Sequence, residues 1–196
     1  MKNFRSTAGD VHALLKSYSN IQSEQIDELV ARSIIKDYKK GENFLRAGDS
    51  AGIVGFVQRG LFRAYCLSSD GQTYIRNFCS QGYFVGSYAS AIRGVQADMT
   101  IEALEESQVL TIEYSLLNAF FQRSSAWQEF GRKVAENHYI ERELKEFRLL
   151  SCSALERHRF FLDENPHLKG RVSQSDIASY IGIAPEYLSR VLKNVK

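Results

Sequence analysis

The spacing of hydrophobic positions changes twice along this chain of 196 residues. Over residues 1–33, and again over 115–150, apolar side chains recur every three or four positions, as they do in amphipathic helices. Over residues 34–114 they occur in short segments of aromatic and branched residues with a period of two, which is typical of strands. Residues 151–196 form a separate helical segment that contains both prolines. This order of segments along the chain predicts short helices, a β domain, one long helix and a small helical domain.

The first helical segment is expected to hold two short helices. Leu14, Leu15 and Tyr18 share one helix face. Ser23, directly before Glu24, is expected to be the N-cap of the second helix. Both helices then flank the β segment that follows.

Glycines divide the β segment at near-equal intervals. They are separated by 12, 11, 11 and 12 residues at Gly48, Gly60, Gly71, Gly82 and Gly94. Short strands with turns at this spacing predict a sandwich or barrel. Asp70–Gly71 is expected to form a two-residue hairpin loop, because such a loop needs a positive φ that glycine tolerates.

The long helix is expected to run from about Ala126 to Leu150. Its apolar stripe consists of Trp127, Phe130, Val134, Ile140, Leu144 and Phe147. At 1.5 Å per residue such a helix is about 37 Å long, which is more than a small barrel covers. We therefore expect it to pack against a second copy of the chain, as in a short coiled coil. The alternative is an amphipathic helix that packs only on its own domain.

The segment RVSQSDIASYIGIAPEYLSRVLKNVK is the most informative part of the chain. Ser173 is expected to cap a helix, with Asp176 as the acidic partner of a capping box. Ile177 and Ile181 then face inward, and the small Ala178 allows another helix to cross closely. These features predict the first helix of a helix-turn-helix.

The second half of the segment fits the same motif. Gly182 can end the first helix with a positive φ, and Pro185 suits the first position of the next helix. Leu188 and Val191 supply that helix with a buried stripe. An ordinary helical hairpin would need the hydrophobic spacing but neither the glycine nor the small residue at these offsets. The segment therefore predicts DNA binding.

Together these features resemble a bacterial transcription regulator of the Crp/Fnr family, which is similar to the cyclic AMP receptor protein. The residues that carry the resemblance in the β segment are Lys40–Gly41–Glu42, Gly48–Asp49, Gly60, Asp70–Gly71 and Gly82. The resemblance covers nearly the whole chain, and the helix-turn-helix is its most specific part.

The resemblance implies an α+β fold with three parts. Residues 1–125 would form a β jelly-roll barrel of the cyclic-nucleotide-binding type with flanking helices. Residues 126–150 would form a dimerisation helix, with Phe130, Val134, Ile140, Leu144 and Phe147 in the dimer interface. Residues 151–196 would form a helix-turn-helix, winged-helix-like, DNA-binding domain.

The resemblance also implies a homodimer on double-stranded DNA, with two recognition helices in major grooves of a near-palindromic site about 34 Å apart. Arg190 and Glu186 align with the family's base-reading arginine and acid, and Pro185 and Ser189 complete the expected base contacts. Expected phosphate contacts are Ser173, Gln174, Ser175, Tyr187 and Lys193. RNA polymerase is an expected partner if the protein is an activator.

Three residues follow Lys193, so the strand hairpin that often follows the recognition helix in the family is expected to be missing. A smaller number of phosphate contacts predicts a modest salt dependence of DNA binding.

The cyclic-nucleotide site of the family is expected to be degenerate in this chain. Family members that bind cyclic nucleotides carry a Gly-Glu pair and an Arg-Ser pair around a short helix. The aligned pairs are Gly86–Ser87 and Ala97–Asp98, so both the acid and the arginine are replaced. Arg93 could substitute only if the loop is re-routed. We therefore expect no tight binding of cyclic AMP. The sequence leaves open whether an unidentified small effector binds in an apolar pocket near Phe78, Tyr88 or Tyr65.

Charge and composition narrow the remaining classes of protein. The net charge is +2; residues 1–150 hold 18 basic and 18 acidic residues, whereas residues 151–196 hold 7 and 5. The surplus positive charge therefore lies in the segment that is expected to bind DNA. No apolar run approaches the roughly 20 residues of a membrane span, and the first residues lack a secretory core, so we expect a cytoplasmic protein that does not bind membranes.

Metal and haem chemistry find little support in the sequence. The three cysteines are scattered, which argues against an iron–sulfur cluster and favours reduced thiols, and His138 in the long helix is expected to be a surface residue rather than a haem ligand. A cupin-type metal enzyme would need histidines inside the barrel. All four histidines, His12, His138, His158 and His167, lie outside residues 34–114. The remaining alternative is a ligand-sensing module that binds a partner protein instead of DNA.

Overall fold

The computed structural model describes residues 11–193; the first ten residues, on which the prediction of no secretory signal rests, and the last three lie outside the described part. The chain divides into two compact units. One comprises Met1–Ala64 with Phe78–Glu136, and the other comprises Tyr65–Asn77 with Asn137–Lys196. The second unit therefore includes the tip of a β hairpin as well as the C-terminal helices.

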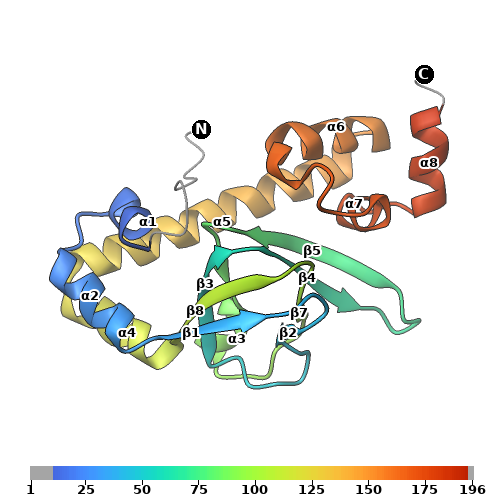
Figure 1. Cartoon of the computed structure of the whole chain (residues 1–196). Coiled ribbons are helices and arrows are strands. Elements are labelled where there is room, and N and C mark those ends of the chain that lie inside the picture. Colours follow the sequence, from blue (N-terminus) through green and yellow to red (C-terminus); the bar gives the residue numbers. More distant parts are fainter. Residues whose placement is uncertain (1–10, 194–196) are drawn as a thin grey trace. The chain divides into compact units, whose positions relative to one another are not determined.

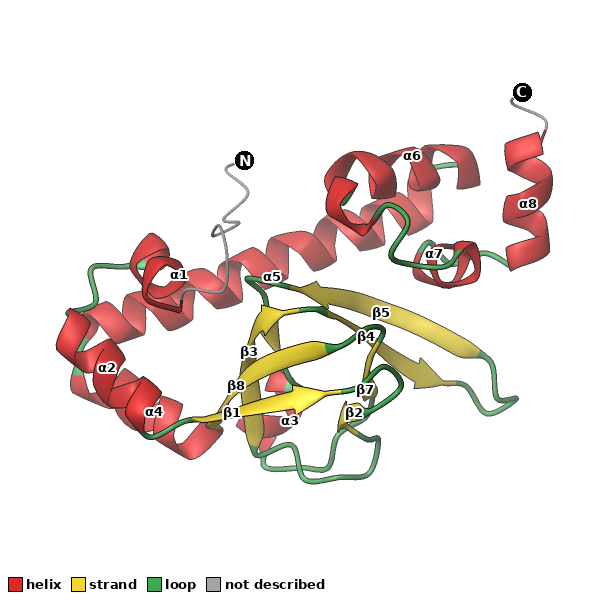
Figure 2. Cartoon of the chain, in the orientation of Figure 1, coloured by secondary structure: helices red, strands yellow, loops and turns green. Residues whose placement is uncertain are grey.

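The β domain is built from two four-stranded sheets, as the glycine spacing predicts (Figures 1 and 2). One sheet has the order β1-β8-β3-β6 and the other β2-β7-β4-β5, which is the strand order of a jelly roll. The strands are β1 (Ile34–Tyr38), β2 (Asn43–Leu45), β3 (Ile53–Arg59), β4 (Leu61–Leu67), β5 (Thr73–Ser80), β6 (Phe84–Val85), β7 (Thr100–Ala103) and β8 (Ser107–Glu113).

Every strand contributes at least one apolar side chain to the cluster between the two sheets. Three aromatic rings lie at its centre: Tyr38 is edge-on to Phe62 at 5.5 Å, and Phe44 lies 6.0 Å from Tyr38 and 6.4 Å from Phe62. These rings fill space between the sheets with side chains of the protein itself.

Helices cover the outer face of the first sheet (Figure 1). They are α1 (Val11–Tyr18), α2 (Ser23–Ala31), α4 (Tyr114–Arg123) and the beginning of α5 (Ser125–Ser151). Their apolar faces pack on Val54 and Phe56 of β3 and on Leu110 and Ile112 of β8. The short helix α3 (Tyr88–Arg93) follows β6.

Two local predictions were wrong. The N-cap of α2 is Gln22, and Ser23 is the first helical residue; its hydroxyl accepts a hydrogen bond of 2.6 Å from Lys16 Nζ. The loop between β4 and β5 has five residues rather than two, and it is closed by the Ser68 N–H, which donates to the carbonyl oxygen of Gln72 at 3.0 Å. Gly71 does adopt a positive φ of 80°, but within this longer loop.

The long helix is confirmed, with 27 residues. Its first turns belong to the core of the β unit, where Trp127 is fully buried and Phe130 is 3% exposed. Trp127 Nε1 donates a hydrogen bond of 3.0 Å to Gln25 Oε1 on α2. Its remaining turns, from Asn137 onward, belong to the second unit.

The C-terminal helices belong to the second unit and have a small core of their own. After α5 come α6 (Ala154–Glu164), the 3-10 turn η1 (Pro166–Leu168), α7 (Gln174–Tyr180) and α8 (Pro185–Lys193). Helix α6 begins with a capping box formed by Ser153 and Glu156. The buried side chains of residues 152–193 are Ala154, His158, Phe161, Leu168, Ile177, Ala178, Ile181 and Leu188.

Candidate nucleic-acid interface

Helices α7 and α8 form the helix-turn-helix in the register that the sequence predicts. The Ser173 hydroxyl caps α7: it accepts from the backbone N–H of Asp176 at 3.0 Å and donates to Asp176 Oδ2 at 2.8 Å. Because this hydroxyl is engaged in the cap, any phosphate contact at Ser173 would have to coexist with these two bonds. Ile177, Ala178 and Ile181 are buried, as expected.

The turn between the two helices depends on Gly182. The N–H of Ile183 donates to the carbonyl of Ala178 at 3.0 Å, and the N–H of Gly182 donates to the carbonyl of Ser179 at 3.2 Å. This pair of bonds, with a left-handed residue between the helices, is a Schellman motif. Gly182 has a φ of +72°, and a Cβ at this position would lie 2.9 Å from the Leu149 side chain on α5. The positive φ therefore favours glycine at this position, whereas the contact with the end of the Leu149 side chain could be relieved by a small movement of that side chain.

Helix α8 begins at Pro185 and presents one buried and one exposed face. Leu188 is 1% exposed, and Val191 is half-buried. The exposed face carries all the predicted base and phosphate contacts of this helix: Pro185, Glu186, Tyr187, Ser189, Arg190 and Lys193. Arg190 lies over the ring of Tyr187, with its guanidinium carbon 5.7 Å from the ring centroid.

The exposed start of α7 lies beside this face. Gln174 lines a shallow depression of about 240 Å³ together with Pro185, Ser189 and Lys193, and two leucines of α8 form its floor. Ser173 and Ser175 are also exposed. The structure thus brings at least four of the predicted DNA-contacting residues to one surface, with hydroxyl, amide and ammonium groups that can donate to phosphate oxygens.

One residue that positions this motif could not be found from the pattern of the sequence. Arg157 on α6 donates from Nη1 to the carbonyl oxygen of Ile181 at 2.7 Å, which satisfies a carbonyl at the end of α7. The two residues are 24 positions apart. Periodicity and capping rules report only on neighbours within about one helical turn, so they hold no signal for this contact.

The residues aligned with the family's nucleotide site lie around α3, at the end of the barrel. Ser87 is fully buried, and its hydroxyl donates to Ser90 Oγ at 2.9 Å. Gly86 has a φ of +149°, and a Cβ there would approach Val54 Cα to 3.2 Å. The backbone at Gly86 is thus held close to β3, and the Ser87 hydroxyl is turned to its own helix.

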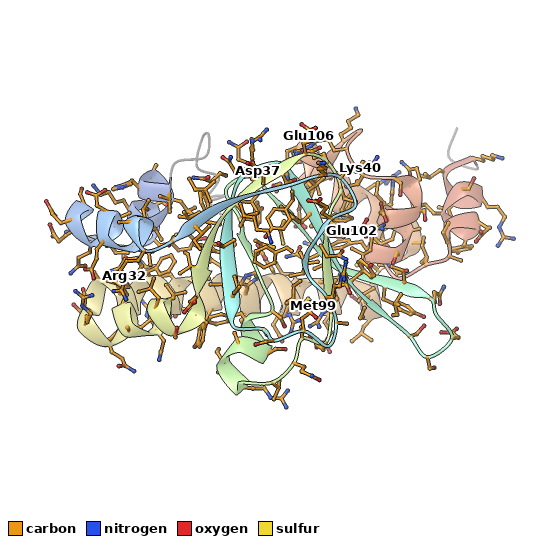
Figure 3. All side chains as sticks on the ribbon, turned by 60° about the horizontal axis from the view of Figure 1, so that its bottom comes forward. Arg32, Asp37, Lys40, Met99, Glu102 and Glu106 are labelled. Atoms are coloured by element: carbon orange, nitrogen blue, oxygen red, sulfur yellow. The ribbon has the colours of Figure 1, made fainter. Side chains whose placement is uncertain are left out.

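The second pair lies before β7. Ala97 is 5% exposed, and its N–H donates to the carbonyl oxygen of Asp49 at 2.9 Å. Asp98 is exposed, and the next residue, Met99, packs against the cluster between the sheets (Figure 3). Arg93 ends α3 and is exposed. Where the family's pattern has an acid and an arginine, this chain thus has the buried hydroxyl of Ser87 and the methyl group of Ala97, and the carboxylate of Asp98 is exposed beside Ala97.

The structure also locates the cysteines, His138 and the other residues that could bind a metal, within the residues that it describes. No group of three or more histidine, cysteine or acidic residues in residues 11–193 could hold a metal ion, and Cys66, Cys79 and Cys152 are free thiols. His138 is exposed on α5, 3.7 Å from Glu141 Oε2. Across the same residues, none of the helices combines the length and the apolar character that a membrane span requires.

Comparison with known proteins finds a family model that matches the β domain and relatives that are similar over most of the chain. Residues 35–124 match the model of the cyclic nucleotide-binding domain. The chain is 28% identical over 184 residues to the fumarate and nitrate reduction regulatory protein of Vibrio cholerae, covering 86% of this chain and 70% of that protein. It is 25% identical over 182 residues to the transcriptional activator protein Anr of Pseudomonas aeruginosa, covering 86% and 72%. The anaerobic regulatory protein of Pasteurella multocida is 25% identical, and 64% of its length is covered.

Solved structures show the same fold. FixK2 of Bradyrhizobium japonicum matches with a TM-score of 0.72 and 24% identity, covering 83% of this chain and 84% of that one. The cyclic di-GMP responsive regulator CLP of Xanthomonas campestris matches with a TM-score of 0.72 and 20% identity, covering 89% and 91%. A further match is a regulator of the Crp/Fnr family from Eubacterium rectale, with a TM-score of 0.71 and 20% identity. The relatives and structural neighbours of this chain are regulators of the Crp/Fnr family.

The stripe predicted for the dimer interface divides between the two units. Phe130 is buried in the core of the β unit, and Val134 packs against the same core. Ile140, Leu144 and Phe147 are 43%, 36% and 63% exposed, respectively, in the single chain. The C-terminal part of the stripe is therefore the part that a second copy of the chain could cover.

Proposed function

We propose that this chain is a sequence-specific DNA-binding transcription regulator of the Crp/Fnr family that acts as a homodimer. The observation that carries the proposal is the face of α8, where Glu186, Ser189 and Arg190 are exposed on a helix whose opposite side is buried by Leu188. An exposed polar face on the second helix of a helix-turn-helix is the arrangement that reads the major groove.

Base contacts are proposed for Arg190, Glu186, Pro185 and Ser189. A guanidinium can donate to O6 and N7 of guanine together, and a carboxylate can accept from the amino group of cytosine. Pro185 has no polar group where many family members place a second base-reading side chain, so we propose that the preferred site differs at that position. Phosphate contacts are proposed for Ser173, Gln174, Ser175, Tyr187 and Lys193, which would fix the register of the helix on the duplex.

The long helix α5 is proposed to join two copies of the chain. Ile140, Leu144 and Phe147 are apolar and exposed on a helix that otherwise carries many charges. Covering such side chains with a second copy removes apolar surface from water. The proposed parts are a sensor domain over residues 1–125, a dimerisation helix over 126–150 and a DNA-binding domain over 151–196.

The sensor domain is proposed to respond to a small effector other than cyclic AMP, or to none. The support is the replacement of the acid and the arginine at Ser87 and Ala97, together with the carboxylate of Asp98. We propose that the chain has no enzymatic activity, acts in the cytoplasm, and contacts RNA polymerase if it is an activator.

Selection of duplex DNA from a random pool, followed by gel-shift titration, tests the proposal. We expect a near-palindromic site, and we expect Arg190→Ala to weaken binding to it by about 1–3 kcal/mol and to relax one base position. Lys193→Gln should weaken binding to all DNA sequences alike and should reduce the salt dependence of that binding by about one ion. Failure of the wild-type chain to retard any DNA at low salt would favour the alternative, a module that binds a partner protein.

Sedimentation equilibrium tests the homodimer. Leu144→Glu should shift the chain toward the monomer, because a charge would replace an apolar contact. Tyr139→Glu is the matched control, since Tyr139 is 64% exposed on the same helix but lies outside the stripe. A wild-type chain that stays monomeric at micromolar concentration would contradict this part of the proposal.

A further inference from the structure

Ser179 on α7 takes part in an unusual contact with a strand. Its hydroxyl accepts a hydrogen bond of 2.9 Å from the N–H of Ile75 and donates one of 2.7 Å to the carbonyl oxygen of Thr73. In a parallel β-ladder, one residue of a neighbouring strand makes this same pair of bonds, to the carbonyl of residue i−1 and the N–H of residue i+1. The serine hydroxyl thus takes the place of one residue of an additional strand beside β5.

Lys145 on α5 holds the next part of the same strand. Its Nζ donates to the carbonyl oxygen of Arg76 at 3.0 Å and is 3.4 Å from that of Ile75. The ammonium also lies 3.7 Å from the centroid of the Tyr180 ring, at the end of α7. One strand segment, Thr73–Arg76, is therefore bound through its backbone by side chains of both α5 and α7.

We propose that Ser179 and Lys145 are positioning residues that fix the orientation of the helix-turn-helix through the edge of β5, and that they thereby set the half-site spacing that the dimer accepts on DNA. The proposal rests on the proposed function. Strand β5 is the last strand in its sheet order, so its outer backbone groups have no strand partner among the described strands. These groups are available to side chains that approach from α7.

The turn between α7 and α8 carries this orientation to the reading helix. The Schellman bonds at Gly182 and the hydrogen bond from Arg157 to Ile181 hold α8 to the end of α7. A shift of α7 along β5 would therefore move α8 with it. Apolar packing alone permits small slips, whereas hydrogen bonds to particular backbone groups specify one register because they require particular distances and angles.

Hydrogen exchange tests the contact without DNA. In Ser179→Ala the amide of Ile75 loses its acceptor, so we expect its exchange rate to rise about 10-fold. Ser179→Thr keeps the hydroxyl and should restore slow exchange. Ser115→Ala, at an exposed serine of α4, is the matched control and should leave the Ile75 amide unchanged. Slow exchange in Ser179→Ala would overturn the assignment of this hydrogen bond.

DNA sites with altered spacing test the consequence. The site selected by the wild-type chain is compared with the same site carrying one inserted central base pair, which moves one half-site by about 3.4 Å and about 35° relative to the other. We expect the wild-type chain to bind the selected site much more tightly than the site with the insertion. In Ser179→Ala and in Lys145→Met this ratio of affinities should fall at least about 5-fold, because each substitution removes hydrogen bonds that define the register. Binding to a single half-site should stay unchanged, and Ser179→Thr should restore discrimination.

The outcomes separate the two proposals. Unchanged spacing discrimination in both Ser179→Ala and Lys145→Met, with rapid exchange at Ile75, would show that the contact exists but does not set the spacing. If Ser179→Ala fails to fold, Lys145→Met alone tests the spacing role, since it removes the hydrogen bonds from α5 and the contact with the Tyr180 ring but changes no residue of α7. If the wild-type chain binds no DNA, the proposed function and the spacing role both fail, while the exchange of Ile75 still reports whether the strand is held.

Discussion

Arg157 on α6 and Ile181 at the end of α7 are joined by a hydrogen bond of 2.7 Å between the guanidinium Nη1 and the backbone carbonyl oxygen. Arg157→Met should keep the packing of the side-chain stem but leave this carbonyl without its partner. We expect a loss of about 1–3 kcal/mol in the free energy of unfolding, together with weaker DNA binding because the turn at Gly182 loosens. Urea denaturation followed by circular dichroism measures the first effect. Arg159→Met, at an exposed position of the same helix, should change the unfolding by a few tenths of a kcal/mol at most.

The contact between Gln25 and Trp127 secures α2 to α5 in the β unit. Trp127 is fully buried, and Gln25 Oε1 is its acceptor at 3.0 Å. Gln25→Leu would leave a buried indole N–H without a hydrogen bond, so we expect a destabilisation of about 1–3 kcal/mol. Gln128→Leu, exposed on α5, serves as the control. Equal unfolding midpoints for both variants, measured by tryptophan fluorescence, would show that this hydrogen bond adds nothing to stability.

His158 gives the C-terminal unit a pH dependence with a defined sign. Burial lowers the pKa of His158 below the ordinary value of 6.5. Above pH 6.5 the imidazole is neutral in the folded and in the unfolded chain. Below it, the unfolded chain binds the proton first, so stability should fall with pH until the lowered pKa of the folded state is reached.

Denaturation curves between pH 5 and 8 measure this dependence. His158→Gln should flatten it, because glutamine does not titrate. Gln128→Leu, at an exposed position of α5, changes no titratable group and should retain the wild-type slope. A wild-type chain whose stability does not change below pH 6.5 would contradict the prediction.

Cyclic AMP and cyclic GMP should bind weakly to the barrel. At about 4 Å and an effective dielectric constant of 20, a carboxylate and a phosphate repel by about 4 kcal/mol, which corresponds to about a thousandfold in affinity. Asp98→Asn should remove this repulsion and strengthen whatever binding there is. Isothermal titration calorimetry measures the nucleotide affinity of the wild-type chain and of Asp98→Asn. Saturation of the wild-type chain at micromolar nucleotide would overturn the prediction.

The local parts of the site could be predicted from the sequence because they depend on neighbouring residues. Ser173, Gly182 and Pro185 each mark a helix end through backbone geometry that the residue type itself favours. The order of helical and β segments followed in the same way from the change of period and the spacing of glycines, whereas the α+β jelly-roll fold was implied by the resemblance to the family.

The errors arose where one residue type suits several local structures. Gly71 has a positive φ, but such a φ fits a five-residue loop as well as a two-residue one. Ser23 can cap a helix, but its hydroxyl is bonded to Lys16, and Gln22 precedes the first turn. The dimer-interface prediction at Phe130 stays a prediction, and in the single chain the surrounding helices cover this residue.

The contacts of Arg157 and Ser179 lay beyond sequence reasoning for a different reason. Ser179 binds backbone groups of residues 104 and 106 positions away along the chain. Only the folded topology brings these segments together. A serine in α7 has no periodicity that would distinguish it from a residue facing solvent.

The hydroxyl of Ser179 also bears on the solubility of the protein. An outer strand with open N–H and carbonyl groups is a template on which other chains can add strands, and this is a common start of aggregation and domain swapping. By occupying the N–H of Ile75 and the carbonyl of Thr73, Ser179 closes two of these groups, and Lys145 engages the carbonyl of Arg76 with a charge that an incoming strand would have to displace. Helix α7 thus protects the sheet from unwanted partners with the same atoms that hold it in place.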